Sequence, residues 1–162
     1  VWVWIQAILL LPAFALITGG LGRPNPSAVG QGGAIEKVDI SKGIFGSTRH
    51  PVMWGIGIWG ITHIISQPSW RALLFFGAII VVALFGSWRQ EQRKAREWGD
   101  AWARWRQKTS FWPFAAILAG RNELNLRAIG YHLLLAAVLL WLGLLHGHGW
   151  LFGVNVLPYL GF

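Results

Sequence analysis

The feature that most constrains this chain is a set of long stretches without a single charged residue. These stretches cover residues 1–20, 51–70, 72–88 and 128–162. About 20 consecutive apolar residues are enough for a helix to cross the hydrocarbon core of a bilayer. We therefore predict an all-α, polytopic transmembrane helix bundle that forms one membrane domain over residues 1–162. The predicted transmembrane helices lie near residues 1–20, 51–69, 72–88 and 128–146.

The composition excludes an ordinary soluble enzyme. Of the 162 residues, 54% are hydrophobic and 12% are charged, against roughly 25% charged in a typical soluble domain. The net charge of +8 would suggest nucleic acid in a polar chain. In a membrane chain, basic groups more readily face lipid phosphates and cytoplasm, so we expect membrane lipid and no nucleic acid as partner. The absence of Cys excludes thiolate metal sites and a Cys nucleophile.

The Lys and Arg residues alternate between the predicted crossings. Four precede residue 51, one stands at Arg71, nine lie in residues 89–127, and none follows. By the positive-inside rule, loops 21–50 and 89–127 are predicted to be cytoplasmic and both chain ends periplasmic, as in a bacterial inner membrane. The chain starts with Val and its one Met is Met53, so we expect further N-terminal helices upstream.

A separate pattern occupies the segment from Trp88 to Lys108. Apolar residues recur at helical spacing on one face, and arginines occupy another face. The apolar face carries Trp88, Ala95, Trp98, Trp102 and Trp105, and the basic face carries Arg89, Arg93, Arg96 and Arg104. This predicts one basic amphipathic helix in the cytoplasmic interface, with its Trp side toward lipid. A calmodulin-type target helix has the same pattern, but the flanking crossings favour the lipid surface.

His63 is the residue within a predicted crossing that most suggests chemistry. It follows Trp59 by one helical turn, so the two side chains share a face. A neutral imidazole there could ligate haem iron, carry a proton, or only bond a neighbouring polar group. His132, His146 and His148 lie near the ends of the last crossing, where interfacial, solvated roles are expected.

The tripeptide Arg49-His50-Pro51 joins a basic loop to a predicted helix start. Pro in the first turn of a helix needs no function, whereas an Arg and a His beside a helix start could hold an anionic group. Glu91 needs a partner, and we expect it to pair with Arg49 or His50 because both are placed on the cytoplasmic side.

The helix predicted to begin near residue 51 contains three residues without a side chain, Gly55, Gly57 and Gly60. They permit close helix packing or the approach of a flat ligand, and packing is the commoner reason. The chain shows no Ser-His-Asp set and no phosphate-binding loop, so the catalytic residues, if any, are unknown from the residues alone.

The run GIFGSTRHPVMWG at residues 43–55, followed by Ile58-Trp59 and His63, resembles the signature of the NnrU family, which includes the plant and cyanobacterial 15-cis-ζ-carotene isomerases. The resemblance spans residues 44–154 and continues through LFGSW at 84–88, WGD at 98–100, KTS at 108–110, PFAAI at 113–117, GR at 120–121 and WLFGV at 150–154.

The resemblance implies a multi-helix membrane protein. In the isomerase branch it implies a b-type haem, held by two His residues, that acts in isomerising the central 15-cis double bond of a polyene. His63 falls at the position of one ligand; the other would lie upstream, on a partner chain, or on a substitute such as His132. The NnrU branch itself is associated with denitrification.

A more distant resemblance is to the isoprenylcysteine carboxyl and phospholipid methyltransferases. It rests on the Arg-His-Pro run and on Gln90-Glu91 ahead of Trp98-Gly99. In those enzymes two adjacent Glu residues help to hold S-adenosylmethionine, and here Gln90 replaces the first. The resemblance implies a cofactor site around Arg49, His50 and Glu91.

Three hypotheses follow for the function. The first is a haem b-dependent isomerase or related redox enzyme acting on a lipid-soluble polyene, with His63 as axial ligand. The second is a non-catalytic accessory subunit of a larger respiratory, denitrification or photosynthetic membrane complex. The third is a membrane methyltransferase that uses S-adenosylmethionine. The sequence leaves open whether the chain is an enzyme.

Overall fold

The computed structural model describes residues 2–28, 30–37 and 42–161, and it contains helices and no strand in this part of the chain. The all-α prediction is confirmed. The four long helices are α1 (Trp2–Leu21), α4 (Pro51–Ser66), α5 (Trp70–Lys108) and α8 (Tyr131–Phe152). The short ones are α2 (Ala34–Lys37), α3 (Ile44–Ser47), α6 (Ala115–Leu118), α7 (Leu126–Ile129) and the 3-10 helix η1 (Leu157–Leu160).

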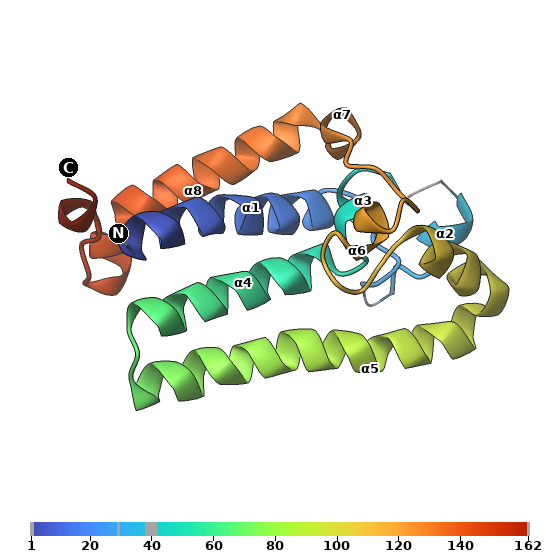
Figure 1. The fold of residues 1–162 in the computed structure, drawn as a ribbon, viewed down its shortest axis with the longest axis horizontal. Helices are drawn as coiled ribbons and strands as arrows, with labels where there is room; N and C mark the ends of the chain where they lie inside the picture. Colours follow the sequence, from blue (N-terminus) through green and yellow to red (C-terminus); the bar gives the residue numbers. More distant parts are fainter. Residues whose placement is uncertain (1, 29, 38–41, 162) are drawn as a thin grey trace.

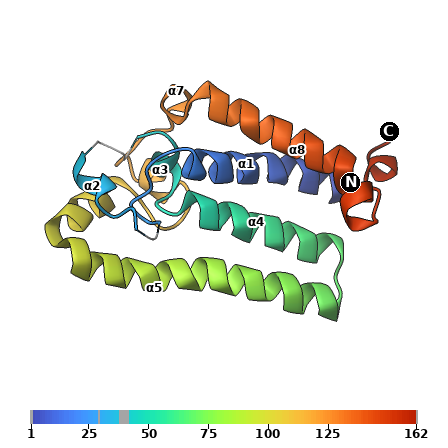
Figure 2. The same ribbon diagram turned by 180° about the vertical axis from the view of Figure 1, so that it is seen from behind.

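The four long helices lie side by side in a row, in the order α8, α1, α4, α5 (Figures 1 and 2). Accordingly, α1 contacts both α8 and α4, and α4 contacts α5. The short helices α2, α3, α6 and α7 gather at one end of the row, and both chain termini lie at the other (Figure 1). A single row covers each outer helix on one side only, so α5 and α8 leave much apolar surface exposed.

Three of these helices are long and apolar enough to cross a membrane, over Val3–Leu21, Trp70–Lys108 and Tyr131–Phe152. Only 6% of the apolar stretch of α8 is buried by the rest of the chain. Such a surface is favourable in lipid and unfavourable in water, as expected of an integral membrane protein. The predicted crossing at 51–69 corresponds to α4, which has 16 residues and is shorter than these three.

The glycines of α4 let the row pack closely, as expected. A Cβ atom at Gly55 would lie 2.6 Å from the backbone oxygen of Ala13 in α1. On the side facing α5, a Cβ atom at Gly60 would lie 2.8 Å from the Ile80 side chain. These approaches are closer than real Cβ contacts allow, so only glycine permits this helix spacing. Both faces are filled by neighbouring helices, which confirms the packing interpretation over the flat-ligand alternative.

Helix α5 continues without a break from the predicted crossing into the basic segment. It changes direction at Gly99, where φ is 45° and ψ is −119°, a backbone conformation that favours glycine. The chain beyond Gly99 folds back toward the short helices (Figure 1). The predicted amphipathic segment is therefore the extension of a membrane helix followed by a returning turn.

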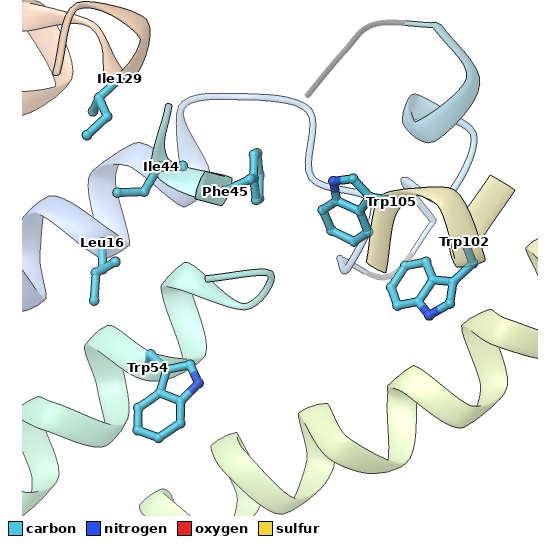
Figure 3. Close-up of a cluster of buried hydrophobic side chains, with 7 residues drawn as sticks. All are labelled: Leu16, Ile44, Phe45, Trp54, Trp102, Trp105 and Ile129. Carbon is cyan, nitrogen blue, oxygen red and sulfur yellow. The ribbon is translucent and has the colours of Figure 1, made fainter. Parts of the chain in front are cut away.

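The core forms where this returning segment meets the short helices. Its buried members are Leu16, Ile44, Phe45, Trp54, Trp102, Trp105 and Ile129 (Figure 3). Trp102 and Trp105 are 1% and 4% exposed, and the ring of Trp105 packs edge-on against Phe45 at 6.0 Å. The expectation that this Trp side faces lipid is wrong for both residues, because the turn at Gly99 directs them inward. Trp88, before the turn, is exposed as expected.

Candidate functional site

The loop that leads into α4 is fixed by hydrogen bonds to segments far away in the sequence. Thr48 Oγ1 donates to the carbonyl oxygen of Phe111 at 2.7 Å, and the Arg49 backbone N–H donates to the carbonyl of Ser110 at 2.7 Å. The Ser27 hydroxyl donates to the Arg49 carbonyl at 2.8 Å. Backbone groups buried here are thus satisfied by separate loops, which sets the direction of the Arg49 and His50 side chains.

Arg49 forms a bidentate ion pair with Glu91 of α5. Its Nε donates to Glu91 Oε1 at 2.6 Å and its Nη2 donates to Oε2 at 3.2 Å. The remaining terminal nitrogen, Nη1, donates to the carbonyl oxygen of Thr109 at 2.9 Å. The side chains of Arg49 and Glu91 are 5% and 12% exposed. This geometry is the strongest form of an arginine–carboxylate contact, and it ties the start of α4 to the middle of α5.

His50 completes the cluster on the same carboxylate. Its Nε2 lies 3.1 Å from Glu91 Oε1, and its ring packs against Phe111 with centroids 5.4 Å apart. Glu91 thus has both Arg49 and His50 as partners, and the prediction that it pairs with one of them is confirmed. The anionic group expected beside Arg49 and His50 is the chain's own carboxylate.

The cluster shifts the pKa values of its members. Burial alone would raise the pKa of Glu91, but hydrogen bonds from His50 and Arg49 and the charge of Arg49 outweigh it and lower the pKa to about 2. Burial lowers the pKa of His50 despite the neighbouring carboxylate. Burial also lowers the pKa of Arg49, yet an arginine stays protonated at neutral pH. The cluster therefore holds a charged Arg49–Glu91 pair and a neutral His50 that donates its Nε2–H.

A cavity of about 410 Å³ opens beside this cluster. It is lined by Arg49, Trp54, Leu84, Trp88, Glu91, Arg106, Phe111 and Trp112. Trp54 is held in the wall because its indole N–H donates to the carbonyl of Phe111 at 2.8 Å. The last turn of α5 and the loop after it contribute residues that the sequence analysis did not single out, namely Arg106, Phe111 and Trp112. Their one signal in the sequence was the neighbouring Lys-Thr-Ser block.

His63 lies in a different part of the molecule, toward the other end of α4. At about 1.5 Å per residue, it is roughly 20 Å along the helix from His50. Its Nδ1 is 2.7 Å from the carbonyl oxygen of Trp59, and its ring stands 4.8 Å from Trp59 and 5.0 Å from Phe76 of α5, centroid to centroid. With Nδ1–H donated to that carbonyl, Nε2 is the ring nitrogen left to accept a proton or a metal ion.

The structure does not bring His132 near His63. His132 lies in the first turn of α8, and the carbonyl of the next residue, Leu133, accepts a hydrogen bond from Thr18 near the C-terminal end of α1. Ser66, close to His63, instead bonds Gln6 near the N-terminal end of α1. Gln6 and Thr18 are about 18 Å apart along α1. The suggestion that His132 substitutes as second haem ligand is therefore wrong for this arrangement.

The remaining histidines lie toward the C-terminal end of α8. His146 Nδ1 is 2.9 Å from the carbonyl of Leu142, and His148 Nδ1 is 2.8 Å from that of Val154. Both bonds are local and exposed, in keeping with interfacial roles.

Comparison with known proteins gives consistent matches. The family model described as "NnrU protein" matches residues 1–156. The 15-cis-zeta-carotene isomerase of Zea mays chloroplasts is 37% identical over 82 residues, and the Arabidopsis thaliana protein of the same name is 35% identical over 82 residues. Each match covers 51% of this chain and 22% of the relative's length. No solved structure matches the chain.

Proposed function

Since the chain belongs to the NnrU family, we propose that it is an isomerase-like membrane protein that acts on a lipid-soluble polyene. The observation that carries this proposal is the 82-residue similarity to the two 15-cis-zeta-carotene isomerases. The three long apolar helices support it, because a polyene hydrocarbon partitions into the same bilayer core that these helices require.

We propose that His63 would hold a haem b through its Nε2. The residues present fit this role, because the Nδ1 hydrogen bond to the Trp59 carbonyl orients the ring and leaves Nε2 free to bind iron. When bound, haem supplies one-electron chemistry that lowers the barrier to rotation about a conjugated double bond. Neither His50, which is bonded to Glu91, nor His132, which lies in α8 beside the end of α1 opposite to Ser66, would serve as a second haem ligand.

The surroundings of His63 suit an apolar substrate. Trp59 and Phe76 flank the imidazole and pack on each other at 5.0 Å, so they fix its ring and exclude water from one side. Aromatic faces of this kind also stack on the flat conjugated chain of a polyene. In this proposal Trp59 and Phe76 position the substrate, and His63 holds the cofactor.

The Arg49–Glu91–His50 cluster has a positioning role in this proposal. It fixes the beginning of α4 against α5, and thereby sets the rotation of α4 that turns His63 toward Phe76. We place the loops with this cluster on the cytoplasmic side, since they carry most of the Lys and Arg residues.

An absorption spectrum of the full-length protein supplied with haem tests the proposal. We expect a Soret band in the wild type, its loss in His63→Ala and its retention in His146→Ala. The His146 variant is a matched control, because its ring makes the same kind of bond to a helical carbonyl on an exposed surface. A wild type without a Soret band, or a His63→Ala variant that keeps it, contradicts haem binding by His63. Chromatography of a 15-cis polyene before and after incubation then tests the isomerase activity separately.

A further inference from the structure

The cavity beside Glu91 lies at the boundary between the uncharged and the basic parts of α5. Leu84 and Trp88 line it from the uncharged part, and the next residue after Trp88 is Arg89, the first of the basic segment. In a membrane helix, such a boundary lies at the depth of the lipid headgroups. The cavity therefore faces the layer where headgroup phosphates are found.

The polar end of the cavity carries more positive than negative charge. Two arginines, Arg49 and Arg106, line it with one carboxylate, Glu91. Both oxygens of Glu91 are engaged by Arg49, and Oε1 also by His50. Arg106 is exposed, and its guanidinium makes no hydrogen bond or ion pair to any residue that the structure describes. Its positive charge is close enough to act on Arg49.

Arg121 adds a further positive charge near the cavity, but its Nη1 is already engaged by backbone carbonyl groups. Arg121 donates through Nη1 to the carbonyl oxygens of Gln107 and Thr109, at 2.7 and 3.1 Å. It thus caps the C-terminal end of α5, where a cation is favourable. Arg106 is left with a full set of donors directed at no described partner, and a guanidinium presents these donors in the fork that matches a phosphate.

The other walls of the cavity are apolar. They are Trp54, Leu84, Trp88, Phe111 and Trp112. Trp88 and Trp112 are exposed at the rim, as indole rings are at the interface of a bilayer. From Trp88 the outer face of α5 continues through Phe85 and Val81, both exposed apolar side chains.

We propose that this cavity binds the headgroup of an anionic phospholipid. The lipid phosphate accepts hydrogen bonds from Arg106, the glycerol region packs between Trp88 and Trp112, and an acyl chain follows Phe85 and Val81 along α5. The apolar walls and the open apolar face of α5 favour a lipid over a soluble phosphate. The site goes beyond the proposed polyene chemistry, because a hydrocarbon offers Arg106 no negative charge.

Native mass spectrometry of the full chain, released from detergent with added lipid, tests this proposal. We expect phosphatidylglycerol to be retained in preference to phosphatidylcholine. Arg106→Gln is expected to weaken phosphatidylglycerol binding about tenfold, the effect of losing one charge-assisted contact. Arg104→Gln is the matched control: Arg104 is exposed on the same segment, does not line the cavity, and its replacement is expected to change binding less than about twofold.

Further arms separate a lipid site from a site for free phosphate and from a merely basic surface. Trp112→Ala is expected to weaken phosphatidylglycerol binding while the Arg106 contact remains, since it removes only an apolar wall. Inorganic phosphate at millimolar concentration is expected not to displace the lipid. Equal losses in the Arg104 and Arg106 variants would mean general attraction to a basic surface and would overturn the proposal. Equal retention of both lipids, or displacement by inorganic phosphate, would overturn it as well. None of these outcomes depends on haem or on isomerase activity.

Discussion

The substitution Glu91→Gln offers a direct measure of what the buried ion pair contributes. It keeps the shape of the side chain but removes the charge that faces Arg49 and His50. The pKa of Glu91 falls from 4.5 to about 2 in the folded chain. At about 1.4 kcal/mol for each pH unit, folding favours the charged form by about 3 kcal/mol. Breaking one partner of a buried pair typically costs about 3–5 kcal/mol, in line with this value.

The free energy of unfolding in detergent micelles, measured by denaturant titration at pH 7, checks the size of this effect. We expect Glu91→Gln to lose about 3 kcal/mol, because Arg49 keeps its charge in a buried place. Glu123→Gln is the matched control, with the same change of charge. Glu123 is exposed in the loop between α6 and α7, so the cost of its replacement is expected to stay below about 0.5 kcal/mol.

A pH series gives the sign of the effect. Because the pKa of Glu91 is lower in the folded chain than its ordinary value, the stability from its charged form is complete above pH 4.5 and is lost as the pH falls toward about 2. The difference in unfolding free energy between wild type and Glu91→Gln should therefore disappear as the pH falls over this range. A gap below about 0.5 kcal/mol at pH 7, or one that does not change with acid, would refute the assignment of this stability to the Arg49–Glu91 pair.

Two further substitutions test the packing, each with its own control. Gly55→Leu is expected to separate α1 from α4 and to cost at least about 2 kcal/mol, since its Cβ would meet the backbone of Ala13 at 2.6 Å; Gly143→Leu, with nothing within 4 Å, should leave thermal unfolding unchanged. Trp102→Ala is expected to cost about 3–5 kcal/mol in the same assay because it empties a fully buried site, whereas the exposed Trp150→Ala should cost less than about 0.5 kcal/mol. Equal melting temperatures within either pair would contradict the packing described here.

Much of the helix layout follows from the sequence because its causes are local. A backbone in lipid must satisfy its own hydrogen bonds, so an uncharged stretch of sufficient length folds as a helix wherever its neighbours lie. The predicted ends are less accurate, since α5 runs on to Lys108 and α8 to Phe152. Charged residues mark where a helix leaves the bilayer, but they do not stop it from continuing into water.

The candidate site, like the helix layout, could be predicted in part from the sequence. The sequence alone predicted the pairing of Glu91 with Arg49 or His50, because a carboxylate near two basic groups on one side of a membrane needs a partner. It also predicted that Trp59 and His63 share a helix face, which depends only on their spacing. Both features rest on charge and helical periodicity, and the structure confirms them.

Only the tertiary structure decided how Trp102 and Trp105 are used and where the cavity opens. The helical pattern of the basic segment fits a lipid-facing side and a buried side equally well, and the turn at Gly99 selects the second. The cavity joins Arg106 to Trp88 through a chain reversal that no local pattern encodes. The sequence thus determined the helices and their charge pairing, which depend on local burial and on charge. The fold decided which faces are covered, because that depends on contacts between residues that are distant along the chain.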